Sequence, residues 1–388
     1  MNGGLLRLPR RGLRAHEKLT PQAAKLILSS RGGARDPLRS LSRCETMPAP
    51  RSIVVVKLSA IGDVLHGVPV AVALKRAFPE ARIGWAVEGR AADVLAGHSA
   101  IDHLFRLPRG WLKSPAAVLS LRQQLRAFAP DVAIDLQGLL KSGVASWLSG
   151  ARMRIGFARP VAREYSWLAA TNLVKPVATH VVDRNCDLLV PLGVRDSRPS
   201  FDMPTWPVSR ERVRHWLTGL RLTAPPVVIN PGAGWASKRW PAERFAALAR
   251  CLHRRHGIRP LVVWGGGEER ALAEQIAADA CGEAVVATNT TLQDLGELFR
   301  LSRLVISGDT GPLHLAAAVG TPCVGLFGPV PAARNGPYGS HHICVEPPEA
   351  LRPKWDDRKT DTVSMAGIEV ERVVAAAEQL LARTKAAA

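Results

Sequence analysis

Short apolar runs alternate with longer segments of helical periodicity along the chain from residue 53 onward. An apolar run of four to eight residues that ends in turn-forming residues is typical of a buried strand. On this basis strands are predicted at 53–57, 82–87, 131–135, 153–156, 172–174, 227–230, 260–264, 284–287, 303–307 and 322–327.

Helical segments lie between the later strands and are predicted at 241–256, 268–280, 292–301 and 311–319, with a last helix at 367–384. A region with six prolines, from about 191 to 226, is expected to be loop-rich. Alternating strands and helices in both halves indicate two α/β domains with mostly parallel sheets, at 51–205 and 206–388. Ligands of such sheets bind beyond the carboxyl ends of the strands, so we expect them in the cleft between the domains.

The composition supports a folded protein of two domains. The 388 residues are 47% hydrophobic and 22% charged, enough to bury real cores. No apolar run reaches the roughly 18 residues of a membrane span. The six cysteines are scattered without a CxxC pair, which indicates a reduced, cytosolic protein without a zinc site.

The formal charge of +19 indicates an anionic partner. Residues 1–50 contribute +7, from ten Lys or Arg and three Asp or Glu, and the remaining residues contribute +12. Nucleic acid is not expected, because zinc-finger spacing is absent and only 5% of the residues are aromatic. A phosphorylated sugar or a membrane lipid would also match this charge.

The first 46 residues differ from the rest, being rich in Arg, Gly and Leu without periodicity. Residues 1–50 are therefore expected to be a disordered or spurious extension. We favour Met47 as the true start over the alternative, an organellar transit peptide.

Asp63 follows the first predicted strand in the stretch "KLSAIGD". This loop is neither a dinucleotide fingerprint nor a P-loop, because GxGxxG and GxxxxGK[ST] are both absent. Asp63 is either a helix cap or a group that faces the cleft. Pro69 suits the first turn of a helix that starts near 69, which would leave Asp63 in an irregular loop facing the cleft.

Two further loops offer a cation and a carboxylate. In "NPGAGWASKRWP" small residues let the backbone approach a ligand and Lys238 adds a positive charge, unless it is only a solvated surface lysine. In "VVWGGGEERA" Glu268 and Glu269 lie in the first turn of a helix, where the dipole favours acids. The alternative is that one of them accepts hydrogen bonds from a ribose diol.

The stretch "VISGDTGPLHLAAAVG" offers a site for a diphosphate. Asp309 or Thr310 can cap the helix that follows, and the N–H groups of Thr310 and Gly311 are free donors at its positive end. Capping alone does not account for the whole polar group, which includes His314. No DxD-type carboxylate pair follows a strand, so we expect no bound metal and no other cofactor.

Five motifs resemble the bacterial ADP-heptose:lipopolysaccharide heptosyltransferases of glycosyltransferase family 9. They are "VVVKLSAIGDVLHGVP", "DLQGLLKS", "PGAGWASKRWP", "SGDTGPLHLAAAVGTPCVGLFGP" and "RNGPYG". The resemblance covers about residues 52–345, and "GDVLHGVP" and "DLQGLLKS" are more similar to heptosyltransferase I than to heptosyltransferase II. It implies the glycosyltransferase-B fold, in which two Rossmann-like domains face each other across a cleft. The first would hold the acceptor and the second the nucleotide-sugar.

The resemblance also implies roles for single residues. Asp63 matches the catalytic base, and Lys238 matches a lysine that binds phosphate. The donor would be bound further by Asp309, Thr310, Gly311, His314 and by Glu268 or Glu269. The acceptor would be bound by Arg163 and by the basic residues Arg109, Lys113 and Lys141. Ala233 and Gly234 depart from the type I enzymes, which have hydroxyl side chains there.

An inverting transfer of heptose to the anionic, lipid-linked Kdo–lipid A inner core is therefore expected. Asp63 would take the proton of the acceptor hydroxyl, on the side opposite to the departing ADP. The basic surface would hold the enzyme peripherally on the cytoplasmic face of the inner membrane. Three alternatives are a family 9 enzyme with another sugar or acceptor, a nucleotide-sugar epimerase of similar architecture, and a non-catalytic nucleotide-sugar sensor. Asp63 argues against the sensor.

Overall fold

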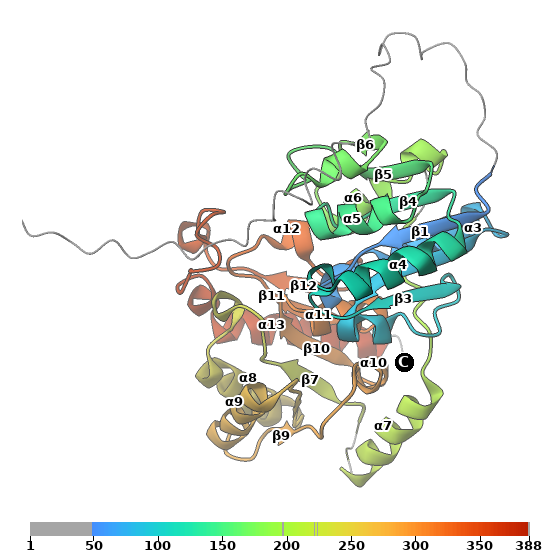
Figure 1. Cartoon of the computed structure of the whole chain (residues 1–388). Helices are drawn as coiled ribbons and strands as arrows, with labels where there is room; N and C mark the ends of the chain where they lie inside the picture. The colour runs from blue at the N-terminus through green and yellow to red at the C-terminus, as the bar shows by residue number, and fades with distance from the viewer. Residues whose placement is uncertain (1–48, 196–197, 221, 223, 387–388) are drawn as a thin grey trace, which may run out of the picture. The chain divides into compact units, whose positions relative to one another are not determined.

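Two sheets of six parallel strands organise the chain in a computed structural model (Figure 1). The structure describes residues 49–386 except 196–197, 221 and 223. The expectations about residues 1–46 and 1–50 therefore lie almost wholly outside the described residues. The chain from Ala49 onward forms one unit by its internal contacts.

The first sheet has the strand order β3-β2-β1-β4-β5-β6. Its strands are β1 (Ser52–Val56), β2 (Arg82–Glu88), β3 (His103–Leu107), β4 (Val132–Asp135), β5 (Met153–Phe157) and β6 (Asn172–Val174). The chain reverses its direction of travel across the sheet between β1 and β4, whose register pairs Ile53 with Val132. A crevice forms at such a point, beyond the carboxyl ends of the two strands.

The second sheet repeats this pattern in the order β12-β11-β10-β7-β8-β9. Its strands are β7 (Val227–Asn230), β8 (Leu261–Val262), β9 (Val285–Val286), β10 (Leu304–Gly308), β11 (Cys323–Leu326) and β12 (Ile343–Val345). Its switch point lies between β7 and β10, where Leu304 pairs with Val227. The loops that follow β1, β7 and β10 are therefore the expected ligand-binding loops.

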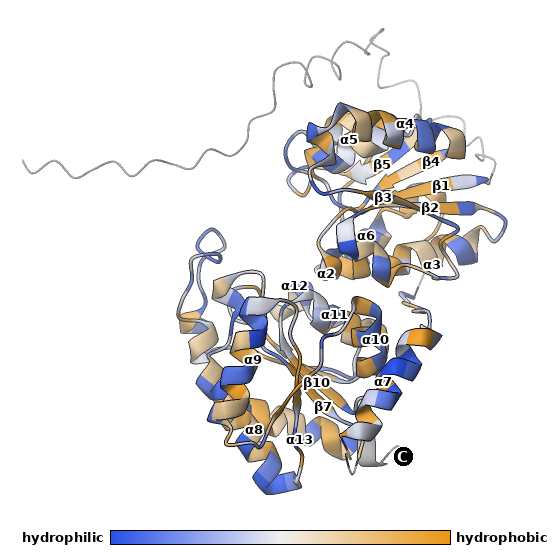
Figure 2. Cartoon of the chain, turned by 60° about the horizontal axis from the view of Figure 1, so that its bottom comes forward, coloured by the Kyte–Doolittle hydropathy of each residue, from blue (hydrophilic) through white to orange (hydrophobic). Residues whose placement is uncertain are grey.

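Helices cover both faces of each sheet (Figure 2). Those of the first half are α2 (Ile61–Leu65), α3 (Val68–Ala77), α4 (Pro115–Phe128), α5 (Leu140–Leu148) and α6 (Val181–Asp187). Those of the second half are α7 (Pro207–Gly219), α8 (Ala242–His256), α9 (Gly267–Asp279), α10 (Leu292–Arg300), α11 (Gly311–Ala318), α12 (Ala332–Asn335) and α13 (Val370–Ala386). The helices α4 and α5 cover one face of the first sheet and α3 and α6 the other (Figure 2). In the second half α8, α9 and α13 lie on one face, opposite α7, α10 and α11 (Figure 2).

The buried apolar side chains form three clusters that follow these layers. One lies between the first sheet and α4 and α5, with Leu121 and Leu125. Another lies between the second sheet and α8, α9 and α13. The third is continuous across the two halves, because it includes Ile53 of β1 as well as Phe299 of α10 and Leu313 of α11.

All ten predicted strands are present, with ends shifted by at most two residues, and the five predicted helices are present too. The expectation of a loop-rich region at 191–226 is wrong in part, because α7 lies within it. Pro207 occupies its first turn, where a missing N–H costs nothing, and Val213 faces inward. The strands β3 and β12 were not predicted. Both lie at sheet edges, where the strand has only one neighbouring strand and its residues need not form a continuous apolar run.

Among the described residues, no helix has the length and apolarity needed to cross a membrane.

Candidate active site

The loops after β1, β7 and β10 line two adjoining cavities. The first, of about 190 Å³, includes Asp63, Lys238, Asp309 and His314 in its lining, and we call it the Asp63 cavity. The second, of about 420 Å³, includes Glu269, and we call it the Glu269 cavity. Both are lined by Ala60, Gly62, Gly234, Thr310 and Gly311. The cavities therefore occupy the two switch points, as the strand order predicts.

The loop after β4 stabilises the loop after β1 through hydrogen bonds. Gln137 accepts hydrogen bonds at Oε1 from the backbone N–H groups of Leu58 (2.7 Å) and Ser59 (3.4 Å). The buried Lys57 ammonium donates to the carbonyl of Leu136 at 2.7 Å. Burial lowers the pKa of Lys57, while the nearby carboxylates of Asp63 and Asp135 act in the opposite direction.

Asp63 lies in the short helix α2, and the expectation of an irregular loop at this position is wrong. Its Oδ2 accepts a hydrogen bond from the N–H of Ala60 at 3.3 Å, which closes the first turn. Gly67 then separates α2 from α3, in whose first turn Pro69 lies as expected. The Asp63 side chain is exposed and lines the cavity, so capping and a role facing the ligand coexist in this residue.

The helices α2 and α11 meet through two glycines. A Cβ atom on Gly62 would lie 2.7 Å from Cδ2 of His314, and one on Gly311 would lie 3.1 Å from Cβ of Ile61. A side chain at Gly62 would force His314 or a helix to shift, and one at Gly311 would be tight against Ile61. The helix that carries Asp63 therefore rests directly on the first turns of α11.

A chain of hydrogen bonds connects the two halves at this contact. His66 Nε2 lies 3.1 Å from His314 Nδ1, and His314 Nε2 lies 3.2 Å from Asp309 Oδ1. Lys238 Nζ donates to Asp309 Oδ2 at 2.5 Å and also lies 4.7 Å from the ring centroid of Trp235. The sequence analysis expected Lys238 to bind phosphate and His314 to bind the nucleotide-sugar, and the structure joins both side chains to Asp309.

Asp309 is the central acceptor of this chain of hydrogen bonds. Asp309 is an acceptor, because its pKa is lowered: burial opposes this, but the hydrogen bond from His314 and the charge of Lys238 outweigh it. His314 therefore donates to Asp309 from Nε2, and its Nδ1 shares one hydrogen bond with His66 Nε2. Burial, with His314 next, lowers the pKa of His66 well below its usual value, and its buried Nδ1 has no partner in the described part of the chain.

The first turn of α11 keeps its backbone donors free of a side-chain cap. Thr310 occupies the N-cap position, but its Oγ1 accepts from Asn230 Nδ2 and lies 3.1 Å from Ser307 Oγ. The N–H groups that follow, at Gly311 and beyond, therefore face the cavities at the positive end of the helix. This is the geometry in which a helix terminus binds an anion.

Of the two glutamates after β8, only Glu269 lines the Glu269 cavity. Its Oε2 accepts from the N–H of Gly265 at 2.8 Å, and a Cβ atom on Gly232 would lie 2.4 Å from its carboxyl carbon. Glu268 is exposed and lines neither of the two cavities. A carboxylate beside the glycine-rich loop after β7 can accept hydrogen bonds from a diol.

The basic residues predicted for the acceptor are spread out. Arg109 lines the Glu269 cavity. Lys141 lies behind its wall, where Nζ donates to Glu88 Oε2 (2.7 Å) and Ser59 Oγ (2.9 Å). Lys113 and Arg163 are exposed and line neither of the two cavities.

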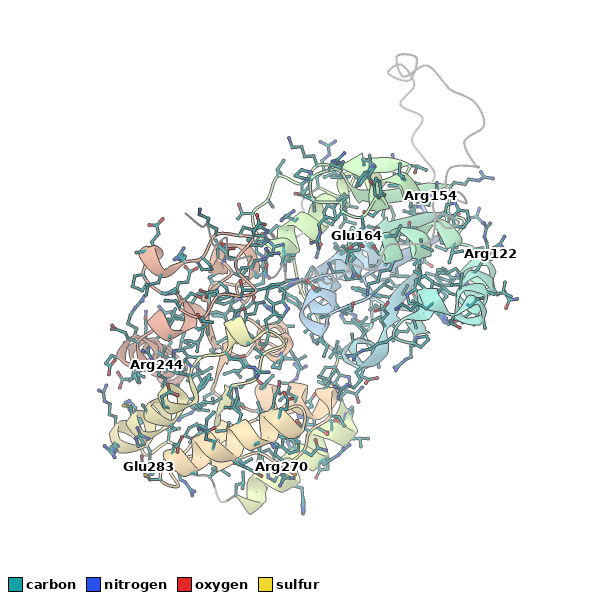
Figure 3. All side chains as sticks on the ribbon, turned by 60° about the vertical axis from the view of Figure 1, so that its left-hand side comes forward. Arg122, Arg154, Glu164, Arg244, Arg270 and Glu283 are labelled. Carbon is teal, nitrogen blue, oxygen red and sulfur yellow. The ribbon has the colours of Figure 1, made fainter. Side chains whose placement is uncertain are left out.

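A third cavity, of about 240 Å³, shares no residue with these two. Arg122, Arg126 and Arg154 line it, and Figure 3 labels Arg122 and Arg154 in the first half of the chain. Because its lining is separate from theirs, we do not include it in the candidate active site. Within the described residues, no three His, Cys, Asp or Glu side chains form a group that could hold a metal ion.

Several residues of the Asp63 cavity were not predicted. His66 is part of the motif "GDVLHGVP", Asn335 is part of "RNGPYG", and Trp235 precedes Lys238 in its loop. The position of His66 one helical turn after Asp63 was a usable signal. Nothing in the sequence indicates its contact with His314, which lies 248 residues away.

The chain is similar to known glycosyltransferases. The model of one family, described as "Glycosyltransferase family 9 (heptosyltransferase)", matches residues 118–362. Lipopolysaccharide heptosyltransferase 1 of Pseudomonas aeruginosa is 29% identical over 327 residues, which are 79% of this chain and 90% of that protein.

Two solved structures have a similar fold. A glycosyl transferase family 9 protein from Veillonella parvula aligns with a TM-score of 0.73 and 24% identity, over 86% of this chain and 97% of its own. E. coli heptosyltransferase WaaC with ADP-2-deoxy-2-fluoro heptose aligns with a TM-score of 0.66 and 24% identity, over 86% and 99%.

Proposed function

The chain belongs to glycosyltransferase family 9 (heptosyltransferase) and has the glycosyltransferase-B fold, and from this premise we propose the reaction that it catalyses. It transfers a heptose from ADP-heptose to the Kdo–lipid A inner core of lipopolysaccharide, with inversion at the anomeric carbon. Asp63 is the general base. The name of the P. aeruginosa relative and the ligand of the E. coli neighbour support this choice of acceptor and donor.

One observation carries the mechanism: Asp63 and Lys238 line the same cavity from opposite halves of the chain. In an inverting transfer the acceptor hydroxyl attacks the anomeric carbon on the face opposite to the leaving group. A carboxylate on one wall can take the proton of that hydroxyl while a cation on the other wall stabilises the departing diphosphate. The placement of these two opposite charges in the lining of one cavity supports this proposal.

The donor is held by the second half of the chain. Its diphosphate lies at the first turn of α11, where the uncapped N–H groups and Lys238 provide positive charge. The ribose hydroxyls reach Glu269 in the adjoining Glu269 cavity. Asp309 and His314 act by holding Lys238 in place, because their hydrogen bonds link it to α2.

The acceptor approaches from the side of the first half. Arg109 lines the Glu269 cavity, and Arg163 and Lys113 are exposed in the same half of the chain. The net charge of +19 would draw the enzyme to the anionic cytoplasmic face of the inner membrane, where the lipid-linked acceptor is embedded. Association with that membrane is peripheral in this proposal.

Substitution of Asp63 by Asn tests the proposal. Asn is nearly isosteric and leaves a side-chain oxygen that can accept from Ala60, so the fold should persist. It cannot accept a proton, so we expect turnover with saturating ADP-heptose and Kdo–lipid A to fall about 10²–10⁴-fold. ADP affinity, measured by calorimetry, should stay the same, because Lys238 and α11 are intact.

Asp279→Asn is the matched control, since Asp279 is an exposed carboxylate at the end of α9, outside both cavities. It should leave turnover unchanged. Near-normal turnover of Asp63→Asn at an unchanged melting temperature would remove Asp63 from the mechanism. Absence of transfer by the unsubstituted protein with this donor and acceptor would refute the assigned substrates.

A further inference from the structure

Arg334 lies beside the Asp63 cavity without a carboxylate partner. It belongs to the short helix α12, and its Nη1 donates to Oδ1 of Asn335 (2.9 Å), which lines that cavity. Its side chain is half-buried. Throughout the described part of the chain, no Asp or Glu oxygen lies within 4.0 Å of its guanidinium nitrogens. A half-buried guanidinium without a carboxylate partner in the described residues can bind an anionic ligand.

Two further arginines lie near Arg334 and add like charge. Burial lowers the pKa of Arg334 first, and Arg184 is the next cause, with Arg358 acting in the same direction. The carboxylates of Asp63 and Asp309 act in the opposite direction and raise the pKa of Arg334. Arg184 and Arg358 are half-buried as well, and in the described residues neither forms an ion pair.

One indole holds two of these arginines. The Cζ atoms of Arg334 and Arg358 lie 5.0 Å and 4.0 Å from the ring centroid of Trp355, and Arg358 also donates to the Trp355 carbonyl. Stacking on an aromatic face fixes a guanidinium without using its N–H donors on a carboxylate. The neighbouring Asp356 and Asp357 are exposed and form no ion pair with either arginine. The N–H donors that remain beside the bonds to Asn335 Oδ1 and the Trp355 carbonyl are therefore available for a ligand.

The segment that carries Trp355 also reaches the other wall of the cavity. Lys359 Nζ lies 5.1 Å from the ring centroid of Trp235, the same ring that Lys238 approaches at 4.7 Å. Trp235 lines the Asp63 cavity. The segment 354–359, "KWDDRK", thus places Arg358 on Trp355 and Lys359 on Trp235, beside the Asp63 cavity.

We propose that Arg334 and Arg358, held on Trp355 and joined by Arg184, form a seat for an oxyanion of a substrate bound in the Asp63 cavity. The seat rests on the proposed function for the identity of that substrate. Carboxylate and phosphate both match the planar fork of a guanidinium. In the proposed function Lys238 and the first turn of α11 bind the diphosphate of the donor. The acceptor is therefore tested first as the substrate that carries this oxyanion, and the donor is tested second.

The test compares Arg334→Ala, Arg334→Lys and Arg358→Ala with the unsubstituted protein. We measure the binding of ADP and of de-acylated Kdo–lipid A by calorimetry, and KM and kcat for both substrates where turnover is present. Loss of a charge-assisted hydrogen bond should weaken binding of one ligand about tenfold to a hundredfold with little change in kcat. Arg334→Lys should recover part of that loss, because lysine keeps the charge but not the fork.

The control is Arg352→Ala, an exposed arginine just before this segment that is already paired with Glu346 at 3.1 Å. It should change neither binding constant. Weaker acceptor binding at unchanged ADP affinity assigns the seat to the acceptor, and weaker ADP binding assigns it to the donor. Unchanged binding of both ligands in the Arg334 and Arg358 variants overturns the seat. Calorimetry needs no transfer, so that result is distinct from a failure of the proposed reaction.

Discussion

Substitution of Gly62 by Ala tests whether the contact between α2 and α11 sets the geometry of the site. Gly62 is in a helix, where replacement of glycine by alanine normally stabilises by about 1 kcal/mol. Here the new Cβ would lie 2.7 Å from Cδ2 of His314, and ordinary van der Waals contact begins near 3.4 Å. The two helices must therefore separate by about 0.7 Å, or His314 must turn away from Asp309.

The magnitudes of these effects oppose each other. Overpacking of a close contact costs about 1–3 kcal/mol, so the net loss of stability is about 0–2 kcal/mol after the gain in helix propensity. At about 2–4 °C per kcal/mol, Tm should fall by less than about 8 °C. The effect on turnover should be larger, because a shift approaching 1 Å in a reacting group can cost about a hundredfold.

The assay combines thermal unfolding with turnover of ADP-heptose and Kdo–lipid A. Gly219→Ala is the matched control, since Gly219 also lies in a helix but has open space around its Cα. We expect the control to keep its turnover and to raise Tm by about 2–4 °C, from the gain of about 1 kcal/mol in helix propensity, whereas Gly62→Ala loses about tenfold to a hundredfold in turnover. A Gly62→Ala protein with full turnover and a raised Tm would refute the argument that the two helices are in tight contact.

Two other predictions concern the hydrogen-bond chain. Lys238→Ala should lower kcat/KM about tenfold to a hundredfold, because a charged hydrogen bond contributes about 1.5–3 kcal/mol. It should also lower Tm, because Asp309 would remain buried without its cation; unchanged kinetics would make Lys238 a structural lysine only. The second concerns His66, whose pKa lies well below the usual 6.5 because of burial, so the unfolded chain binds a proton that the folded chain does not. Its contribution to stability is complete above pH 6.5 and is lost as the pH falls towards the folded pKa, by up to about 1.4 kcal/mol per unit. Melting curves at pH 7 and pH 5 should show a fall in Tm that His66→Gln reduces, with a remainder due to His98, His180 and His342, whose pKa values are also lowered; an equal fall in the variant would contradict the assignment.

The sequence predicted the strands well because buried parallel strands are continuous apolar runs. The run at 53–56 is an example, since all of its residues are fully buried. The edge strand β3 was missed because Arg106 and His103 break its apolar pattern, and both side chains are exposed. The helix α7 was missed because prolines were taken to mark loops, although Pro207 starts the helix.

The residues that line the cavity were predictable where they lie in the segments between a strand and the next long helix. Asp63, Lys238 and Thr310 follow β1, β7 and β10, and parallel strands bring such residues to one edge of a sheet. The choice of Glu269 over Glu268 depends on the angle at which α9 starts, which no pattern of residue types records. Contacts between the two halves, such as that of His66 with His314, cannot be read from sequence periodicity either.

The apolar cluster that runs from β1 to α10 and α11 makes the two halves thermodynamically dependent on each other. Trp206 strengthens this dependence, because its indole donates to the carbonyl of Ala96 and its backbone N–H donates to Glu297. Neither half can lose its packing without exposing apolar surface of the other. The chain from Ala49 should therefore unfold in one cooperative transition, and a cut between the halves should leave two fragments that aggregate. The same apolar packing then stabilises the fold and keeps the two walls of the Asp63 cavity aligned.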